Sequence, residues 1–569
     1  MTINTTAGDE ICEAATPLLN DVVVPCSVDF TGRQSVRSKS GCWKSSSFLI
    51  AVGMAERFAY YGISLNMVSY LTGNLGLPTA SAAAILNAWY GTSSLLPILG
   101  AYVADAFSGR FRMIVAACVL YVAALGFLTI SASLNSYTSS PNQLELIFFF
   151  VSFSLVAFAQ AGYLPCVQAF AADQFDEEDE DEHKAKSSFF NWWNCFSSAV
   201  ILLPLLVLTY IQDNVSWELG FGIPAIIMCF SLIVFLIGSR TYRFRKNGDG
   251  TNPFVRIYRV FARAAKNCRV APDEATSVEE EEDSRTLPHG GAQIGFLNKA
   301  LLASSNGLTD NEKICSIADV EDAESILRLA PLWFSCLGYA IIYAQPSTLF
   351  TKQAATLDRH ITPGFQIPAA SLQYCFIAAP FMVSIPIYDR VFVPVARSVT
   401  GVRSGITMLQ RVGTGLVLSL ASIVSAAVVE RKRLGVAREC GLVDEPTAMV
   451  PMSVWWLAPQ YVLSGIADVF AIVGLQEFFY DQVPSELRSI GLALYISILG
   501  TGNLISSFLI SSIQNVTSGN SSGGWFSDNL NRAHLDYFYW VLAGLSAAGF
   551  VAFVCSTKSY VYKRGFFQY

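Results

Sequence analysis

The chain has 569 residues, of which 53% are hydrophobic and only 14% are charged. Soluble chains of this length carry charge on about a quarter of their residues, so the composition excludes an ordinary soluble protein. The formal net charge of -7 is concentrated in two acidic runs, DEEDEDE at 176–182 and VEEEED at 278–283, and therefore does not indicate a nucleic-acid partner.

Apolar blocks follow the polar residues 1–46 and dominate the rest of the chain. Each block has about 20 residues, the length that crosses a hydrocarbon core of about 30 Å. The sequence therefore predicts an all-α membrane protein with twelve transmembrane helices in two six-helix halves. The expected spans are 47–73, 80–106, 111–133, 144–170, 188–211, 218–239, 326–350, 368–389, 405–429, 453–479, 487–512 and 535–556.

This pattern divides the chain into five regions. They are a cytosolic N-terminal tail at 1–46, a six-helix bundle at 47–239, a cytosolic linker at 240–325, a second six-helix bundle at 326–556 and a cytosolic tail at 557–569.

Lysine and arginine in the short loops predict the orientation, because these residues favour the cytosolic side. They gather in loops on the side of the N-terminus, such as 240–246 and 390–403, whereas the loops at 74–79 and 134–143 have none. Both chain ends are therefore expected in the cytosol. The segment ERKR at 430–433 disagrees, since it would form an outside loop. The sequons fall in loops assigned outside, and the glycosylation candidates are Asn214, Asn515 and Asn520.

The linker contains the segment FVRIYRVFARAAK at 254–266, with apolar side chains on one helical face and basic side chains on the other. This pattern predicts a basic amphipathic helix at the cytosolic membrane surface. A solvated linker helix without a special role is the alternative. The acidic run at 176–182 is expected to be a solvated loop, and 278–283 a linker without fixed structure.

Two six-helix halves joined by a cytosolic linker are typical of secondary transporters, in which one half rocks against the other around a midplane site. A channel or a membrane enzyme can share this topology. An enzyme is not expected, because the four histidines lie in predicted loops and there is no HExxH, GxSxG or Walker pattern. The thirteen cysteines are scattered singly, so neither a metal site nor a cofactor is expected.

Glu56 and Arg57 stand side by side in AVGMAERFAYYGI, at 51–63, within the first apolar block. Charge inside a membrane span is costly, and it is functional by default. We therefore expect Glu56 and Arg57 to take part in proton coupling or in a working ion pair. A static structural pair is the alternative.

A turn between the second and third blocks, GAYVADAFSGRF at 100–111, resembles the glycine–aspartate–glycine–arginine pattern of major facilitator transporters. Asp105 at a helix end and Arg110 in the turn are expected to pair at a cytosolic gate and to separate as the halves rock. An ordinary turn with flanking charge is the alternative.

Further segments resemble the proton-dependent oligopeptide transporter (POT) family, and more closely its plant nitrate/peptide branch. They are ERFAYYGI (56–63), PCVQAFAADQFD (165–176), FFNWWNCFSS (189–198), GFGIP (220–224), IPAASLQ (367–373), LQRVGTGL (409–416), PQYVLSGIADVF (459–470), EFFYDQVPSELRS (477–489) and NLNRAHLDYFYW (529–540). The likeness covers essentially the whole chain. It implies the major facilitator fold and transport of a small solute, such as nitrate, a di- or tripeptide, a plant hormone or a glycosylated metabolite.

Two departures from the family pattern bear on proton coupling. The resemblance implies Glu-x-x-Glu-Arg on the first helix and a lysine before the proline of the fourth, and these groups serve proton coupling. Here Gly53 replaces the first acid and Leu164 replaces the lysine. Losing both members of a buried pair leaves no unpaired charge. We therefore expect either facilitated diffusion or coupling through Glu56 alone.

The resemblance also implies a substrate pocket lined from several helices. Asp468 occupies the helix-ten position where peptide-transporting relatives carry a glutamate for a substrate amine, and it is grouped with Glu56 and Arg57 as a proton-coupling or ion-pair residue. Tyr343 stands where nitrate-transporting relatives can carry a histidine, which argues against nitrate without excluding it. The expected lining is Tyr60, Tyr61, Asn87, Trp89, Asn191, Trp192, Tyr343, Gln345, Ser347 and Asp468.

The sequence thus predicts a secondary transporter that moves a small organic solute or anion, with protons as a candidate partner, across a lipid bilayer. A transporter-like sensor that binds a ligand and reports through the linker with little flux is the alternative. The monomer is expected to be functional. The segment EAATPLLND at 13–21 resembles an acidic dileucine sorting signal, so both the vacuolar membrane (tonoplast) and the plasma membrane stay open.

Overall fold

The computed structural model describes residues 23–136, 143–176, 199–245, 253–266, 317–362, 365–401, 406–446, 448–484, 488–517 and 524–560, with single positions between 179 and 197 and at 297. The dileucine-like motif at 13–21, the acidic run at 278–283, Asn191 and Asn520 lie outside the described residues.

Helices of the first half coincide with the predicted blocks, and the block at 188–211 is described in part. They are α1 (Cys42–Ser64), α2 (Met67–Gly73), α3 (Thr79–Val103), the π-helical turn η1 (Ala104–Ser108), α4 (Arg110–Ser136), α5 (Gln143–Ala172), the π-helical turn η2 (Pro204–Leu208), α7 (Thr209–Asn214) and α8 (Trp217–Gly238).

The linker contains α9 (Pro253–Lys266), and the helices of the second half follow, several of them interrupted. They are α11 (Ile317–Leu327), α12 (Ala330–Ser335), α13 (Leu337–Tyr343), η5 (Pro346–Phe350), α14 (Thr351–Ala355), α15 (Ala369–Ile387), η6 (Tyr388–Phe392), α16 (Val393–Thr400), α17 (Met408–Glu439), η7 (Val454–Leu457), α18 (Ala458–Asp481), α19 (Arg488–Thr517) and α20 (Leu535–Ser559).

Within the described residues, 7 helices are long and apolar enough to cross a membrane, or up to 8 when the bent pair Asp319–Ser335 and Leu337–Ala355 counts as one span. The other predicted blocks coincide with helices that are shorter, less apolar or interrupted. The structure is therefore consistent with twelve spans, and the predicted all-α membrane fold is confirmed.

Short strands flank the helices. β1 (Val23–Val28) pairs antiparallel with β2 (Gln34–Val36) and with β3 (Phe244–Arg245), which gives the order β2-β1-β3. β4 (Leu357–Asp358) runs parallel to β7 (Val450–Ser453), and β5 (His360–Thr362) pairs antiparallel with β6 (Phe365–Gln366). The predicted polar tail at 1–46 therefore contains a folded sheet from residue 23 onward, and α1 begins earlier than expected.

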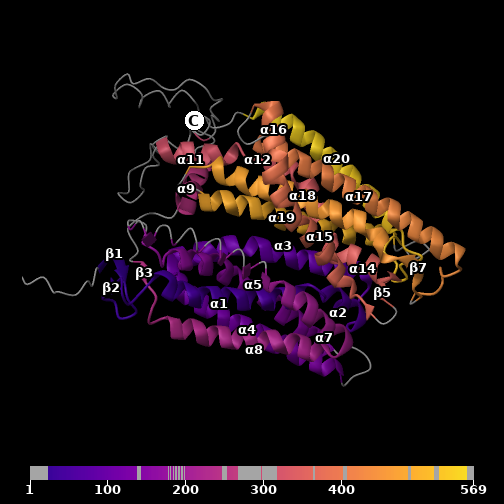
Figure 1. Ribbon diagram of the computed structural model, residues 1–569, viewed down its shortest axis with the longest axis horizontal. Coiled ribbons are helices and arrows are strands. Elements are labelled where there is room, and N and C mark those ends of the chain that lie inside the picture. Colours follow the sequence, from indigo (N-terminus) through magenta and orange to yellow (C-terminus); the bar gives the residue numbers. More distant parts are fainter. Residues whose placement is uncertain are drawn as a thin grey trace, which may run out of the picture.

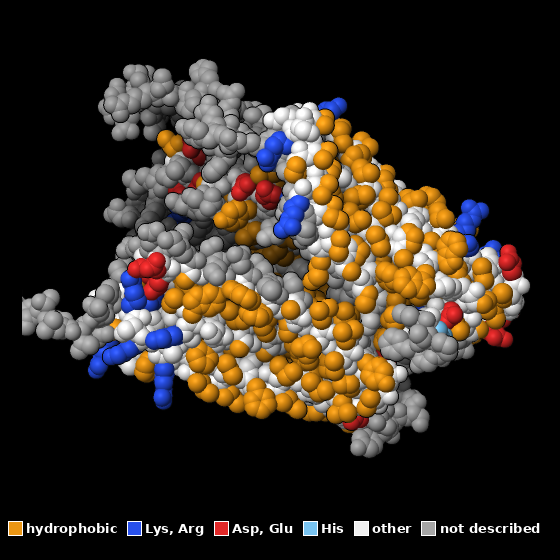
Figure 2. Space-filling model, in the orientation of Figure 1, with side chains coloured by type: hydrophobic (Ala, Val, Ile, Leu, Met, Phe, Trp, Pro, Cys, Tyr) orange, Lys and Arg blue, Asp and Glu red, His pale blue; other side chains and the backbone are white. Residues whose placement is uncertain are grey.

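The two halves lie one beside the other, the first from indigo to magenta and the second from orange to yellow (Figure 1). We call the end of the bundle that carries β1–β3 and α9 the tail end, and the end that carries α14, β5 and β7 the loop end. Figure 2 shows lysine and arginine side chains gathered at the tail end of the first half. The cytosolic position of the tails stays a prediction.

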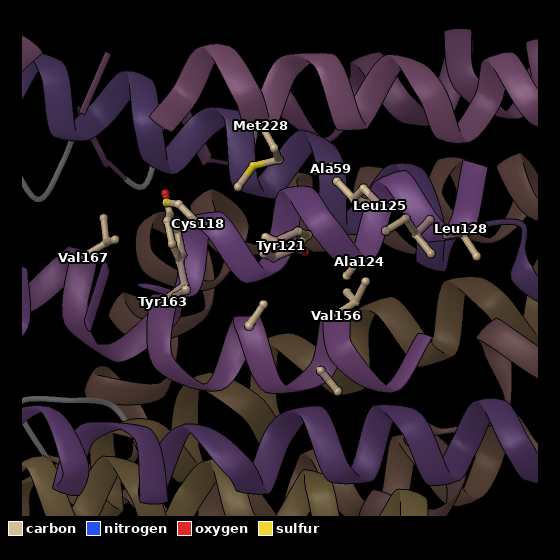
Figure 3. Close-up of a cluster of buried hydrophobic side chains, with 14 of the residues drawn as sticks. Ala59, Cys118, Tyr121, Ala124, Leu125, Leu128, Val156, Tyr163, Val167 and Met228 are labelled. Carbon is tan, nitrogen blue, oxygen red and sulfur yellow. The ribbon is translucent and has the colours of Figure 1, made fainter. Parts of the chain in front are cut away.

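Each half has its own buried core. In the first half, α1, α4, α5 and α8 bring together side chains that include Ala59, Tyr121, Leu125, Val156 and Met228 (Figure 3). Helices in a membrane associate by close packing rather than by leaving water, and small side chains let their backbones approach. The core therefore fixes α1, which carries Glu56, against three neighbouring helices.

Local sequence explains where several of these helices begin. The Ser216 hydroxyl caps α8 by accepting a hydrogen bond from the Leu219 N–H, and Thr407 and Gln410 form a capping box before α17. Pro204 and Pro346 begin the π-helical turns η2 and η5. Proline has no N–H to continue the α-helical hydrogen bonds, and such π-turns occur frequently at functional sites.

The outside loop predicted at 430–433 is wrong, because α17 continues through these residues. Arg433 Nη2 lies 2.7 Å from Glu430 Oε1, and both side chains are fully buried. Arg433 Nη1 also donates to Asn531 Oδ1 at 2.8 Å, and Gln353 Nε2 donates to Glu430 Oε2 at 2.8 Å. This buried pair is satisfied by its own neighbours, so its charges say nothing about orientation.

The solvated loop predicted at 176–182 is wrong for Glu182, which is buried, whereas Asp181 is exposed. Arg243 Nη1 lies 2.7 Å from Glu182 Oε2, and both residues are buried. Arg37 Nε lies 3.4 Å from Glu182 Oε1, and Arg37 also pairs with Asp179. The Glu182 N–H, with a further contribution from Arg37, holds the pKa of Asp179 below its usual range. These acids fasten the N-terminal sheet to the tail end.

The amphipathic linker helix α9 forms as predicted, and several of its apolar side chains pack on protein, whereas Tyr258 is 72% exposed. Ile257 belongs to a core cluster of the second half, and Val260 and Ala264 share a buried cluster with residues of α11. Arg256 Nη2 lies 3.0 Å from Asp322 Oδ2 on α11. Part of the apolar face thus packs on protein, and the position of α9 at the membrane surface stays a prediction.

Candidate functional site

A cavity of about 420 Å³ lies between the two halves. Its walls come from α1, α3 and residues 201–205 on one side and from α13, η5, α15, α17, α18 and α19 on the other. Sites for small organic ligands have volumes of about 300–1,000 Å³. The lining residues are Tyr60, Tyr61, Ser64, Tyr90, Ser94, Ile201, Leu202, Leu205, Tyr339, Ile342, Tyr343, Pro346, Ser347, Ile377, Met382, Ser419, Ser464, Ala467, Asp468, Leu499 and Asn503.

Five of the predicted pocket residues meet at this cavity: Tyr60, Tyr61, Tyr343, Ser347 and Asp468. The Tyr60 and Tyr61 rings meet edge to face, with centroids 5.4 Å apart. Pro346 begins the π-turn η5 at the wall, which places Ser347 on the lining. The cavity therefore combines hydroxyl-bearing aromatic rings with one carboxyl group.

Asp468, on α18, is the acid that lines the cavity. Tyr339 Oη donates a hydrogen bond of 2.6 Å to Asp468 Oδ1. Within the described part of the chain, no lysine, arginine or histidine forms an ion pair with Asp468. Its second oxygen, Oδ2, accepts no hydrogen bond from the described residues, so it is available to a bound solute.

The predicted tryptophans lie behind the lining or away from it. Trp89 stacks on Tyr60 with ring centroids 5.5 Å apart, and its Nε1 donates to the Phe153 carbonyl at 2.8 Å. Trp89 thus supports Tyr60 from behind. Trp192 is 48% exposed and does not line the cavity, and its neighbour Asn191 lies outside the described residues.

Asn87 and Gln345, also predicted as lining, instead join the two halves. Asn87 Nδ2 and Gln345 Nε2 each donate to Ser506 Oγ at 3.0 Å. All three residues are buried. Their role in the structure is a polar junction next to the cavity.

Glu56 and Arg57 form a loose pair outside the cavity lining. Arg57 Nε lies 3.9 Å from Glu56 Oε2, and the exposed fractions of the two side chains are 26% and 1%, respectively. Glu56 Oε1 has no hydrogen-bond partner among the described residues. Glu56 precedes Tyr60, a lining residue, by one helical turn, so it can respond to changes at the cavity.

Gly53 faces an aromatic ring rather than empty space. A side-chain carbon built at position 53 would lie 2.4 Å from Cη2 of Trp193, which is buried and packs on Phe189 with ring centroids 5.8 Å apart. Glycine is thus required for this close approach of α1 and the Trp193 ring. On α5, Tyr163 Oη donates to the Val52 carbonyl at 2.7 Å, and its neighbour Leu164 is half-buried.

Hydrogen bonds close the two halves at the loop end. The Thr79 N–H donates to Asp528 Oδ1 at 2.9 Å, and Lys352 Nζ donates to Thr72 Oγ1. Deeper in the bundle, Ser371 Oγ donates to the Leu205 carbonyl at 3.1 Å. At the tail end, Figure 2 shows a hollow between the halves.

Comparison with known proteins gives a consistent result. The sequence profile described as the POT family matches residues 111–526. Two proteins of Arabidopsis thaliana, Protein NRT1/PTR FAMILY 5.10 and Protein NRT1/PTR FAMILY 5.14, are 54% and 52% identical over 562 and 552 residues, covering 97% and 96% of this chain and 98% of each relative. The chain belongs to the POT family.

A solved structure supports the fold of this POT-family member. The crystal structure of an auto-inhibited POT family peptide transporter superposes with a TM-score of 0.70 at 19% identity, covering 92% of this chain and 99% of that chain. The protein is an integral membrane transporter with the major facilitator fold. The prediction that it is not an enzyme agrees with these relatives, which are transporters.

The predicted gate residues of this POT-family member lie at the turn between η1 and α4. Gly109 has a φ of 74°, a conformation that favours glycine. Arg110 Nη1 lies 2.5 Å from Asp173 Oδ2 at the end of α5. The side chain of Asp105 lies outside the described residues, so its pairing with Arg110 stays a prediction.

The glycosylation candidates differ in position. Asn214 is the last residue of α7 and is exposed, and its Nδ2 donates to the Tyr210 carbonyl at 3.1 Å. Asn515 lies within α19 rather than in the predicted loop. Attachment to Asn214 and Asn515 stays a prediction, as does attachment to Asn520.

Sequence reasoning missed several residues that line the cavity of this POT-family member, notably Tyr90, Tyr339 and Asn503. Tyr339 precedes Tyr343 by four residues, so both lie on one helical face. That spacing was a usable signal. Asn503 had no comparable signal, because it sits in a long apolar helix whose facing partner cannot be identified from one sequence.

Proposed function

We propose that this POT-family protein is a secondary transporter that carries a small organic solute by alternating access. The cavity between the halves is the observation that carries the proposal. It is closed at the loop end by hydrogen bonds between the halves and hollowed at the tail end. Rocking of the halves would expose the same site on either side in turn.

Proton coupling in this proposal runs through Glu56 on α1. Glu56 is buried, its Oε1 has no described partner, and its distance of 3.9 Å to Arg57 is longer than that of a close ion pair. A carboxyl group held so loosely can gain or lose a proton without breaking a hydrogen bond. Trp193 occupies the space beside Gly53, so a second acid one turn before Glu56 would overlap the ring unless the ring shifted.

Arg110 has the proposed role of a tail-end gate residue, together with Asp105. Its ion pair with Asp173 ties α4 to the end of α5. Movement of the halves would change which acid Arg110 contacts. The plasma membrane and the tonoplast both remain candidate locations.

Uptake of a panel of small organic solutes into oocytes that express the protein, at an external pH of 5.5 and 7.5, tests the proposed proton coupling. Replacing Leu18 and Leu19 by alanine, in the wild type and in every variant, removes the dileucine-like motif and favours delivery to the cell surface. We expect acid to stimulate uptake by the wild type, and Glu56→Gln to remove the difference between the two pH values. Glu145→Gln, a substitution of another buried glutamate at the start of α5, serves as the matched control.

Equal wild-type uptake at both pH values would instead make the protein a facilitator and would refute coupling through Glu56. A wild type that is stimulated by acid and a Glu56→Gln variant that keeps this response would place the proton on another group. Both results would leave solute transport through the cavity intact.

A sensor with little flux is the second candidate, because the linker is coupled to the second half. α9 contacts α11 through the Arg256–Asp322 ion pair and through Ile257 in the second-half core. A ligand that moved this half would also move α9. Saturable solute binding by purified protein, without flux in proteoliposomes that support a known transporter, would favour the sensor.

A further inference from the structure

The described lining of the cavity has a negative side chain and no positive one, and this difference indicates which solutes the cavity can bind. Among the described lining residues, Asp468 is the one charged side chain. The nearest helix-one cation, Arg57, does not line the cavity and lies beside Glu56, whose charge opposes its own. A solute therefore meets an uncompensated negative group, which favours a cation over an anion.

The geometry at Asp468 suits a hydrogen-bond donor from the solute. Tyr339 Oη already donates to Oδ1 at 2.6 Å and so fixes the orientation of the carboxylate. Oδ2 receives no hydrogen bond from the described residues. An ammonium group can donate to Oδ2, whereas a carboxylate or nitrate would bring two acceptors together.

The aromatic lining adds a second preference for a cation. Tyr60, Tyr61, Tyr90, Tyr339 and Tyr343 all face the cavity. The faces of aromatic rings attract cations, and this attraction strengthens where water is excluded. Phenol hydroxyls can also bind hydroxyl groups on an organic skeleton. The apolar residues of the wall accommodate the carbon atoms of such a skeleton.

We propose that the solute is an organic amine with one protonated nitrogen on an aromatic or hydroxylated skeleton and without a carboxylate. This inference rests on the proposed transport through the cavity. It separates the protein from carriers of inorganic anions, which need a lining cation. It also separates it from carriers of amino acids and peptides, whose carboxylates need a cation opposite Asp468.

Four probes with one shared skeleton test the proposal: tyramine, the alcohol tyrosol, the acid 3-(4-hydroxyphenyl)propionate and the zwitterion tyrosine. Each is measured for uptake into proteoliposomes, together with nitrate, and for its effect on the thermal stability of the purified protein. We expect tyramine to be carried fastest and tyrosol more slowly. The acid, the zwitterion and nitrate should not be taken up, and they should not raise the thermal stability of the protein.

Variants of α18 connect this selectivity to Asp468. Asp468→Asn should lower tyramine uptake by about tenfold or more, the value of one charge-assisted hydrogen bond, and should lower tyrosol uptake by a smaller factor. Asp468→Glu keeps the charge and should keep the preference for the amine. Glu477→Gln is the matched control, because Glu477 lies on the same helix but pairs with Arg411 at 3.2 Å.

The measurements distinguish failure of the amine proposal from failure of the proposed transport. Preferential uptake of the acid, the zwitterion or nitrate would overturn the amine proposal and leave the transporter standing. Stabilisation by tyramine without flux of any probe would support the amine site and contradict transport. An Asp468→Asn variant that stays folded, by its thermal stability, and carries tyramine like the wild type would refute the assigned role of Asp468.

Discussion

The Glu56–Arg57 and Glu430–Arg433 pairs each lie within a single helix of this transporter, and their surroundings differ. Glu430 and Arg433 lie 2.7 Å apart with both side chains fully buried, and they also bond to Gln353 and Asn531. Glu56 and Arg57 lie 3.9 Å apart, with one carboxyl oxygen unpartnered and the arginine partly exposed. The first pair has the contacts of a static structural element, and the second does not.

This difference teaches how to interpret intramembrane charge in the chain. A buried pair repays the cost of leaving water only when its geometry is good and its remaining polar atoms are hydrogen-bonded. The Glu430–Arg433 pair meets that condition and ties α17 to α14 and the loop before α20. The Glu56–Arg57 pair does not meet that condition. Its presence is therefore better explained by the proposed proton coupling than by a contribution to the stability of the fold.

The largest expected effect is the loss of the tight pair. Arg433→Met leaves Glu430 buried without its cation and should lower the free energy of unfolding by about 3–5 kcal/mol. The thermal unfolding midpoint of protein purified in detergent provides the measurement. The double variant Glu430→Gln/Arg433→Met should recover most of the loss, because no charge remains unpaired. A single variant as stable as the wild type would contradict the assignment of this pair as structural.

A smaller effect is expected where the loose pair would be rebuilt toward the family pattern. Gly53→Glu with Leu164→Lys places a side chain against the Trp193 ring, where a carbon would lie 2.4 Å from Cη2. Such overpacking should cost about 1–3 kcal/mol of unfolding free energy. Adding Trp193→Ala should return part of the stability by making room for the glutamate. A double variant without Trp193→Ala that is as stable as the wild type would show that the ring moves aside freely.

The smallest effect on the free energy of unfolding is expected from neutralising the glutamate of the Glu56–Arg57 pair. Glu56→Gln removes a charge whose Oε1 has no partner, and it should change the unfolding free energy by less than about 1 kcal/mol. Glu430→Gln leaves Arg433 facing a neutral amide and should cost several times more. Thermal unfolding of both variants side by side gives the comparison. Equal losses would remove the distinction between the two pairs.

The sequence predicted the architecture because length and apolarity determine which segments can span a membrane. The long apolar helices coincide with predicted blocks, whereas α16 and most of α11 lie outside them. Family motifs placed Tyr60, Tyr61, Tyr343, Ser347 and Asp468 at the cavity. Predictions that depended on a helix face or on a motif position could be made from the sequence, because both properties are set by neighbouring residues in the chain.

Predictions that depended on a distant partner were less successful. The acidic run at 176–182 was expected in solvent, but Glu182 pairs with Arg243 across 61 positions of sequence. Asn87 and Gln345 were expected at the cavity, but they meet at Ser506. Gly53 suggested only a missing acid until the structure placed Trp193 against it. Such pairings come from tertiary packing, which one sequence does not encode locally.

The small sheet at the tail end joins two points that lie far apart in the chain. β1 precedes α1, β3 follows α8, and the two strands pair directly. Backbone hydrogen bonds between β1 and β3 therefore hold together the segments before the first helix and after the last helix of the first half. The remainder of the predicted linker follows β3. A nick in the linker would therefore leave the first half with both of its ends secured.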